Sequence, residues 1–449
     1  MTRMRIPSPV AAGRRWVLVA RRYLAGGPAW FVLGVVAVLL LISARALIFP
    51  PASPERGELV ILSGADDSVG EQRQQLIDEW NRTHHDNPAR LESLSSQADA
   101  QHSEMVARAQ SGNSGVDVYN LDVTWIAEFA AAHFIRALDD SVNTVGFLDV
   151  PLQTCYFDGK LWALPFNTDA GLLFYRTDLV KSTAALPRQL PPSEADMRAL
   201  AVANHQLQAG YVSQLAHYEG LTVNALEAIW AAGGDVVSGN RVVIDSEAAR
   251  AALQQLARGL AATGDLPPAV LPASTTFTER TSTEAFRSGA VALMRNWPVA
   301  YGQLKNSPDQ GGGQGFDISK NFTVVRLPGP SVLGGQNLAI SSDTKKPRAA
   351  QELIEFLTSD SSERKLFRDG GFAATRGAAY ADTSVRAMRP YAETLLAALT
   401  SARQRPPTTH YALFSSVFQD VVSQALAQQG TLPDDAVARL TDALNGRLR

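Results

Sequence analysis

The sequence predicts an α/β protein whose body has two lobes and follows an N-terminal membrane helix. Three observations support this expectation. Short apolar runs alternate along the chain with amphipathic helical patterns, which is typical of sheets covered by helices. The body after residue 57 has roughly 390 residues, more than a single hydrophobic core accommodates. An uncharged run at residues 23–44 follows a basic segment.

The first 57 residues determine where the body is expected. They contain eight arginines and one glutamate, and the uncharged run at 23–44 has 22 residues, about the length that crosses a bilayer as a helix. Because arginines precede this run, residues 1–22 are expected in the cytoplasm and the body outside. Residues 45–57 are proline-containing and are expected to form a stiff linker. Ala44-Arg45-Ala46 is also compatible with signal-peptidase cleavage, so two outcomes stay open: a retained anchor, which the length favours, or a secreted body.

Composition excludes several classes of function. The formal net charge is −3 for the whole chain and +7 for residues 1–57, so the remainder carries −10. An acidic body lacks the basic surface that nucleic-acid binding needs. The single cysteine, Cys155, excludes an intramolecular disulfide and is expected to be a small buried hydrophobe. The sequence shows no Walker A motif, G-x-S-x-G elbow or H-E-x-x-H pair, and we expect no cofactor and no metal site.

The first half of the body is expected to begin with a buried strand and a helix. The apolar run at 59–62 predicts a parallel strand. Ser68-x-x-Glu71 predicts a capping box. This box opens a helix on which Leu76 and Trp80 share one face. Further elements are expected as strands at 116–119, 161–164 and 172–175 and as a helix at 124–134.

The second half repeats this alternation. The glycine-rich stretch at 311–315 predicts a flexible loop, because it lacks the spacing of a dinucleotide-binding motif. Elements are expected as helices at 246–262, at 349–357 and from residue 414 onward, and as strands at 290–294 and 322–327.

Polar and aromatic residues stand where several of these strands are expected to end. Ligands of open α/β sheets bind outside the carboxyl ends of the strands. Side chains of Asp, Asn, Gln and Arg can hydrogen-bond the hydroxyl groups of a sugar there, and tryptophan offers an apolar face to a sugar ring. Glycines let the backbone approach a ligand closely. The segments that share this feature are 120–125, 165–171, 295–298, 334–337 and 375–377.

Two of these residues are also compatible with an enzyme that hydrolyses sugars. Asp122 and Asp169 are carboxylates at two strand ends, and a pair of carboxylates also carries out glycoside hydrolysis. Sequence spacing does not separate a catalytic pair from two hydrogen-bond acceptors. A carbohydrate-active enzyme that uses Asp122 and Asp169 therefore remains an alternative.

Several of these segments, taken in chain order, resemble the sequence motifs of a known protein family. Residues 117–125 are followed by Glu128-Phe129-Ala130, and the most specific part is 161–165 with 167–176. The pattern continues at 218–221, Trp230, Gly233-Gly234, 289–294, 296–297, 335–340 and 375–376. Together they resemble the family 1 extracellular solute-binding proteins, which are the sugar-capturing subunits of ABC importers, and in particular the trehalose- and maltose-type members. The resemblance spans roughly residues 58–449.

The resemblance implies a two-lobed, periplasmic-binding-protein-like fold with several chain crossings, a hinge and a central ligand cleft. The first lobe would take residues 58–166 with about 328–368, and the second residues 167–327 with about 369–449. The body would be a monomer that binds a mono- or disaccharide, delivers it to ABC permease subunits and catalyses no reaction. The candidate ligand-binding residues are Asp67, Asp122, Trp125, Asn167, Asp169, Glu219, Asn296, Trp297, Gly335, Gln336 and Arg376.

One departure from the family concerns the anchor. Members are often attached to the membrane by a lipid on a cysteine behind the signal segment, but no cysteine lies near Ala44. A retained helix at 23–44 would take the place of the lipid. A further alternative is a binding module that passes ligand occupancy to a separate sensor instead of a permease.

Overall fold

The structure is a computed structural model, and it describes residues 34–38, 40, 55–66, 68, 70–306 and 317–447. The chain divides into two compact units, Met1–Pro54 and Glu55–Arg449, of which the second is the body. Residues 34–38 and 40 are helical. Among the described residues, no helix combines the length and the apolar character needed to cross a membrane. The rest of the predicted segment at 23–44, with its flanks at 1–22 and 45–54, lies outside the described residues.

The first lobe is built on a six-stranded sheet. Its strands are β1 (Leu59–Gly64), β2 (Ala89–Leu94), β3 (Val118–Asp122), β4 (Ile135–Arg136), β7 (Ala163–Ala170) and β14 (Leu333–Ser341). The order is β2-β1-β3-β14-β4, and β7 also pairs with β14. β1 runs parallel to β2 and β3, whereas β14 runs antiparallel to β3, β4 and β7. All of β1 is buried, which confirms the strand predicted at 59–62.

The second lobe is built on a four-stranded sheet. Its strands are β8 (Leu172–Arg176), β9 (Ala209–Val212), β12 (Val291–Asn296) and β13 (Phe322–Arg326). The order is β13-β8-β12-β9, with β12 parallel to β9 and antiparallel to β8. Two small hairpins lie outside the main sheets: β5 (Tyr156–Phe157) with β6 (Lys160–Leu161), and β10 (Val237–Ser238) with β11 (Arg241–Val242).

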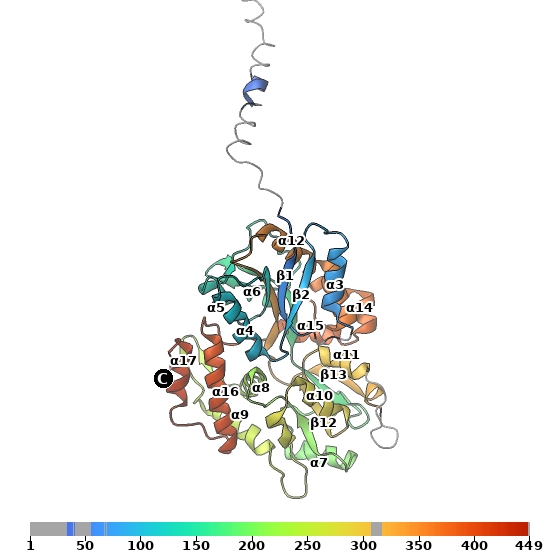
Figure 1. Ribbon diagram of the computed structural model, residues 1–449. Coiled ribbons are helices and arrows are strands. Elements are labelled where there is room, and N and C mark those ends of the chain that lie inside the picture. The colour runs from blue at the N-terminus through green and yellow to red at the C-terminus, as the bar shows by residue number, and fades with distance from the viewer. Residues whose placement is uncertain are drawn as a thin grey trace, which may run out of the picture. The chain divides into compact units, whose positions relative to one another are not determined.

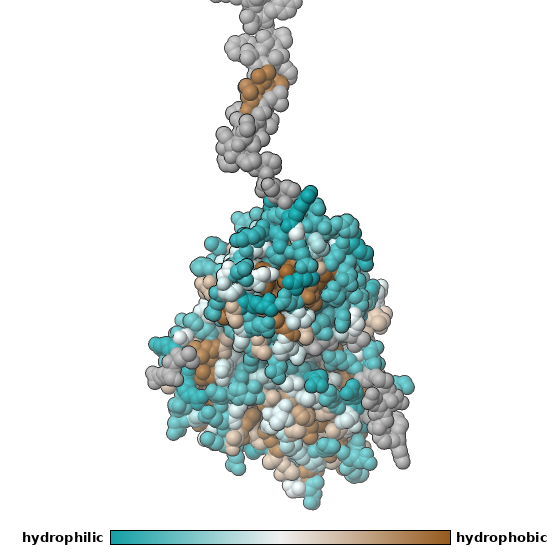
Figure 2. Space-filling model, in the orientation of Figure 1, coloured by the Kyte–Doolittle hydropathy of each residue, from teal (hydrophilic) through white to brown (hydrophobic). Residues whose placement is uncertain are grey.

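Helices cover both sheets, as Figure 1 shows. Around the first sheet lie α3 (Gln72–Asn81), α4 (Ala98–Gln110), α5 (Ile126–Ala131), α6 (Asp149–Gln153), α12 (Pro347–Leu357), α13 (Asp360–Lys365) and α14 (Thr383–Met388). Helix α15 (Ala392–Thr400) packs against both sheets, on β7 of the first and β13 of the second. Around the second lie α7 (Glu194–Ala203), α8 (Glu219–Ala231), α9 (Glu247–Gly259), α10 (Glu279–Arg287), α11 (Val299–Lys305), α16 (Tyr411–Ala427) and α17 (Ala436–Leu444). The visible face of the body is mainly hydrophilic (Figure 2), because most apolar side chains are inside.

Three chain segments join the lobes and lie side by side. Gly171 alone separates β7 from β8, residues 327–332 lead from β13 to β14, and residues 401–410 lead from α15 to α16. Gly171 N donates to Ser331 Oγ at 2.5 Å. Arg403 N donates to the Ser331 carbonyl, and Leu333 N donates to the Arg403 carbonyl, both at 2.8 Å. These crossings form the candidate hinge of the two-lobed fold.

The structure differs from the predicted elements at several ends. Ser68 and Glu71 form no capping box: Glu71 takes the left-handed conformation with no side-chain bond at the helix end, although Ser68 Oγ accepts from Gln72 N at 3.2 Å. The helix predicted at 124–134 is confined to α5. β7 continues in the first sheet to Ala170, beyond the predicted lobe boundary at 166. The loop predicted at 311–315 lies outside the described residues.

Cys155 is fully buried, as predicted for a small hydrophobe. It belongs to the apolar cluster that also contains Phe129 and Ala163. Burial raises the pKa of its thiol far above the usual value, because a thiolate would be poorly solvated there. The residue therefore has a packing role and a thiol that resists ionisation.

Candidate functional site

A cleft of about 450 Å³ lies between the two lobes. Strand ends from both sheets contribute to its lining, as expected for a ligand site in an α/β protein. The structure brings nine of the eleven predicted residues to this cleft: Asp122, Trp125, Asn167, Asp169, Glu219, Asn296, Trp297, Gly335 and Gln336. Of the other two, Asp67 lies outside the described residues, and Arg376 is not among the residues that line the cleft.

Asp169 is a half-buried acceptor near the end of β7. Its Oδ2 accepts from Asn167 Nδ2 at 3.3 Å. Burial raises the pKa of its carboxyl to about 7, although the Arg73 and Arg295 guanidinium groups act in the opposite direction. Within the described part of the chain, the buried Oδ1 atoms of Asn167 and Asn120 have no hydrogen-bond partner. The floor of the cleft thus presents acceptors that a ligand with hydroxyl groups can satisfy.

Trp297 follows β12 and is held from several directions. Its Nε1 donates to Glu279 Oε1 at 3.3 Å, and the Arg295 guanidinium lies over its ring at 3.8 Å from the centroid. A Cβ at Gly334 would lie 3.2 Å from Trp297 Cη2, so the ring packs closely on this glycine. Asn296 Oδ1 accepts from Trp297 N at 2.8 Å. Asn296 therefore serves to position Trp297, and its own amide is largely used inside the protein.

Arg73 is a cleft residue that sequence reasoning missed. It comes from α3, and its Nη2 donates to Gln336 Oε1 at 2.9 Å while its Nη1 donates to Ser63 Oγ at 3.3 Å. Gly335 has φ +121°, and a Cβ there would lie only 2.3 Å from the Asn167 carbonyl oxygen. Glycine is required at this position because β14 approaches β7 so closely.

Arg405 is the second missed residue, and it joins the lobes. Its Nη2 donates to Asp122 Oδ1 at 2.7 Å and its Nη1 donates to Glu219 Oε1 at 2.8 Å. Asp122 ends β3 in the first lobe, whereas Glu219 begins α8 in the second. Glu219 also accepts from the Tyr411 and Ser415 hydroxyls of α16, each at 2.5 Å. Burial raises the pKa of Glu219, and the Arg405 charge opposes that rise.

The wall beside this bridge contains Trp125. Its indole is buried and meets His102 edge-on, with ring centroids 5.2 Å apart. His102 in turn lies 2.8 Å from Glu128 Oε2. Trp125 therefore shapes the wall of the cleft but has little free ring face to offer.

Asp122, one of the two carboxylates of the alternative enzyme site, is already bound by groups of the protein. Asp122 Oδ1 accepts from Thr124 N at 2.9 Å and from Thr124 Oγ1 at 2.7 Å, besides Arg405. Asp122 is therefore engaged by three donors of the protein itself, as is typical of a carboxylate that holds two segments together. In the parts of the chain that the structure describes, no cluster of His, Cys, Asp or Glu side chains is placed to hold a metal ion.

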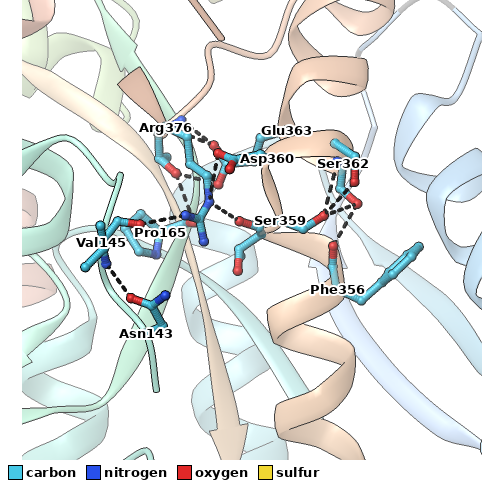
Figure 3. Close-up of polar contacts among 12 residues, drawn as sticks. Asn143, Val145, Pro165, Phe356, Ser359, Asp360, Ser362, Glu363 and Arg376 are labelled. Carbon is cyan, nitrogen blue, oxygen red and sulfur yellow. Dashed lines mark hydrogen bonds and ion pairs between the residues drawn. The ribbon is translucent and has the colours of Figure 1, made fainter. Parts of the chain in front are cut away.

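Arg376 ties together segments of the first lobe, as Figure 3 shows. Its Nε donates to the Thr358 carbonyl at 2.6 Å, and its Nη1 donates to the Val145 carbonyl at 2.9 Å. Its guanidinium lies 3.9 Å from the centroid of the Phe147 ring. The structure does not bring Arg376 together with Asp169. Its Nε also lies 3.8 Å from Asp360 Oδ1. Contacts of this kind with two backbone carbonyls and a nearby carboxylate are typical of a residue that fixes loops.

The neighbour of Arg376 in Figure 3, Glu363, has a fully buried carboxyl group. It accepts from Thr375 N and Thr375 Oγ1, each at 2.5 Å, and from Arg376 N at 3.0 Å. Burial raises the pKa of Glu363 to about 8, against the effect of these donors. Ala373 of the same segment pairs with Thr168 of β7. Glu363 thus holds the strand-like segment that supports the floor of the cleft.

Comparisons with known proteins agree with this geometry. A profile of bacterial extracellular solute-binding proteins matches residues 75–390. A protein of Deinococcus radiodurans, described as a probable ABC transporter-binding protein, is 30% identical over 434 residues, which cover 88% of this chain and 95% of that protein.

Solved structures show the same architecture. Maltose-bound MalE3 of T. maritima is 29% identical, with a TM-score of 0.77 over 87% of this chain and 99% of its own. The GacH receptor of Streptomyces glaucescens, studied without ligand and with acarbose, is 21% identical, with a TM-score of 0.73 over 88% and 100%. At that identity the second match supports the fold alone.

Proposed function

The chain belongs to the bacterial extracellular solute-binding proteins, and we propose that its body captures a small neutral sugar and hands it to the permease of an ABC transporter. The expected family and the two-lobed α/β fold are thereby confirmed. Its relatives are binding proteins of ABC transporters and not enzymes. The proposal concerns the ligand, a mono- or disaccharide, and its delivery.

The observation that carries the proposal is the lining of the cleft. Trp297 offers an apolar ring and Asp169 offers a carboxyl group beside it, next to the same Gly334. The Asn120 and Asn167 amide oxygens, which have no hydrogen-bond partner among the described residues, offer further acceptors. A sugar ring has an apolar C–H face and a hydroxyl edge, so it can satisfy both kinds of surface. The volume of about 450 Å³ is within the range of small-molecule sites. Maltose in MalE3 of T. maritima is consistent with a ligand of this size.

We also propose that residues 23–44 are retained as a single-pass anchor. An extracytoplasmic position of the body fits the family. The basic residues before the uncharged run favour an orientation with the body outside. The eight linker residues 50–57 reach less than about 30 Å, so an anchored body would stay close to a membrane-embedded permease.

A thermal-shift screen of the body, residues 55–449, against neutral mono- and disaccharides tests the proposed function. A sugar present at about 100 times its dissociation constant should stabilise the folded body by roughly 2.7 kcal/mol. The same sugars should not be converted to products during the assay. Binding of no sugar in the panel would contradict the proposal, and product formation would favour an enzyme instead.

A further inference from the structure

A second cavity of about 270 Å³ adjoins the main cleft. Helix α4 contributes Asp99 and His102 to it, and helix α16 contributes Ser415 and Gln419. The residues that touch both spaces form what we term the dividing wall: Ala98, Asp122, Trp125, Glu219 and Arg405. The two spaces therefore meet at these residues.

Arg405 bridges the two lobes within the dividing wall. It is only 4% exposed, and its two terminal nitrogens bind carboxylates from opposite lobes, Asp122 and Glu219. Hydrogen bonds between charged groups are the strong ones. The hydroxyls of Tyr411 and Ser415 support Glu219 from behind. Moving Arg405 aside would leave the buried Glu219 and the partly buried Asp122 without a counter-charge, which is unfavourable.

One atom of Arg405 remains unused by the described part of the protein. Its Nε is buried and has no hydrogen-bond partner there. A buried N–H without a partner is costly and points to an acceptor that belongs in the complex. Arg405 lines the main cleft as well as the second cavity, and the acceptor that we assign to its Nε is an oxygen on the end of a sugar bound in the main cleft.

We propose that Arg405 determines the length of the sugar that this protein binds. The bridge to Asp122 and Glu219 ends the main cleft, and Arg405 Nε donates to a terminal oxygen of a ligand that fills this cleft alone. A longer oligosaccharide would need the space of the second cavity, which the dividing wall closes off. The protein is thus specific for short sugars. This inference rests on the proposed sugar-binding function.

The first test uses the wild-type body and an oligosaccharide series that begins with the disaccharide identified in the screen. Maltose, maltotriose and maltotetraose form such a series. Titration calorimetry should show affinity falling by roughly tenfold or more when the chain outgrows the main cleft. Equal or higher affinity for the four-unit sugar would overturn the inference. If no sugar of any length binds, the proposed function itself fails and the inference fails with it.

The second test removes the wall. Arg405→Ala joins the two cavities, so affinity for the short sugar should fall roughly tenfold while affinity for the longer sugars rises, which reverses the ranking. Ser416→Trp fills the second cavity from α16, where Ser416 lines it. The single variant Ser416→Trp should leave the affinity for the short sugar unchanged. The double variant with Arg405→Ala should lose the increased affinity for longer sugars. An unchanged ranking in folded Arg405→Ala protein would overturn the inference.

A conservative variant covers the case in which Arg405→Ala does not fold. Arg405→Lys keeps a positive charge between the two carboxylates but lacks the planar fork and the Nε donor. Short-sugar affinity should fall while the preference for short over long sugars persists, because the wall remains closed. Wild-type affinity in Arg405→Lys would overturn the role of Nε.

Discussion

At the scale of single residues, Trp297 is the aromatic side chain on which sugar binding should depend most. Its ring packs on Arg295 and Gly334 and donates to Glu279. Trp297→Ala should lower sugar affinity by roughly tenfold or more, because the apolar face for the ring is lost. The contacts with Arg295 and Glu279 should make the unliganded body less stable as well, by roughly 1–2 kcal/mol. Calorimetric titration and urea unfolding measure the two effects.

Trp162 supplies a matched control for this variant. It is also half-buried, and its Nε1 donates to the Phe157 carbonyl at 2.9 Å, but it does not line the cleft. Trp162→Ala should destabilise the body without changing sugar affinity. An equal loss of affinity in both variants would mean that Trp297 acts only through folding.

The carboxyl of Asp169 should make sugar binding depend on pH. Burial raises its pKa to about 7, so it is mostly protonated below that pH and mostly charged above it. A sugar hydroxyl donates more strongly to the charged form, so affinity should rise between about pH 6 and pH 8 and level off above. Titration across this range, with Asp169→Asn as the variant whose profile is flat over the same interval, checks the prediction. A flat wild-type profile would remove Asp169 from the ligand contacts.

The residue scale also shows what sequence reasoning can find in a site. Asp122, Asn167 and Trp297 were predicted because they stand at strand ends, and strand ends meet at one edge of a sheet. Arg73 and Arg405 lie on a helix and in a crossing segment, where no local pattern marks them. Their positions follow from how distant segments pack, which sequence spacing does not reveal.

At the scale of secondary-structure elements, the close approach of β14 to β7 should depend on Gly335. Its φ is +121°, and a Cβ added at this residue would lie 2.3 Å from the Asn167 carbonyl oxygen, so there is no room for a side chain. Gly335→Ala should lower the free energy of unfolding by about 3 kcal/mol or more, through strain and displacement of β7. Urea unfolding measures the change.

Gly112 is the matched control for Gly335. It also has positive φ, +66°, but a Cβ there would meet nothing within 4 Å. Gly112→Ala should therefore cost only about 1–2 kcal/mol from the left-handed conformation. Similar losses in both variants would show that close packing of β14 on β7 contributes little.

The segment 373–376 should depend on the buried carboxyl group of Glu363. Glu363→Ala would leave the two Thr375 donors and Arg376 N without an acceptor. We expect a loss of roughly 3 kcal/mol in the free energy of unfolding, since buried unsatisfied donors are costly. Glu352→Ala, on the exposed face of α12, should change stability by less than about 0.5 kcal/mol. Equal stability of the two variants, read from thermal melts, would contradict this role.

Elements with a strong local signal were predictable. The helix expected at 246–262 appears as α9, with Ser246 Oγ accepting from Ala249 N at its start. The strand at 290–294 appears as β12. The capping box at Ser68 was wrong because Asp66 binds the backbone there: its carboxylate accepts from Ser68 N and Arg73 N, both at 2.9 Å. Asp66 and Ser68 both offer oxygens to the backbone N–H groups at the start of α3. Which of them accepts depends on how the chain folds there, and the capping-box motif does not specify it.

At the scale of the whole molecule, we predict that residues 23–44 stay in the mature protein. N-terminal sequencing of the native protein should recover residues before Tyr23, because the uncharged run has the length of a spanning helix. The protein should fractionate with membranes, whereas a chain that starts at Glu55 should be released and keep its sugar affinity. A mature start near Leu47 would contradict retention and identify a cleaved signal.

The two-lobed architecture was predictable from length and alternation, but the division of the chain between lobes was only approximate. Residues 167–170 stay in the first sheet because β7 pairs with β14 up to Ala170. Residues 373–376 also run against β7 and the loop that contains Phe147. Pairings between segments some 200 residues apart in sequence leave no mark on local hydrophobic patterns.

The burial of Cys155 has a practical consequence for following sugar capture in solution. The chain has no other cysteine, and this one is inaccessible and hard to ionise. A cysteine introduced at Gln97, on the exposed rim of the cleft, would therefore be the only thiol that reacts readily with an alkylating dye. A polarity-sensitive fluorophore attached there would report occupancy of the cleft as a change in emission, in an otherwise unaltered protein.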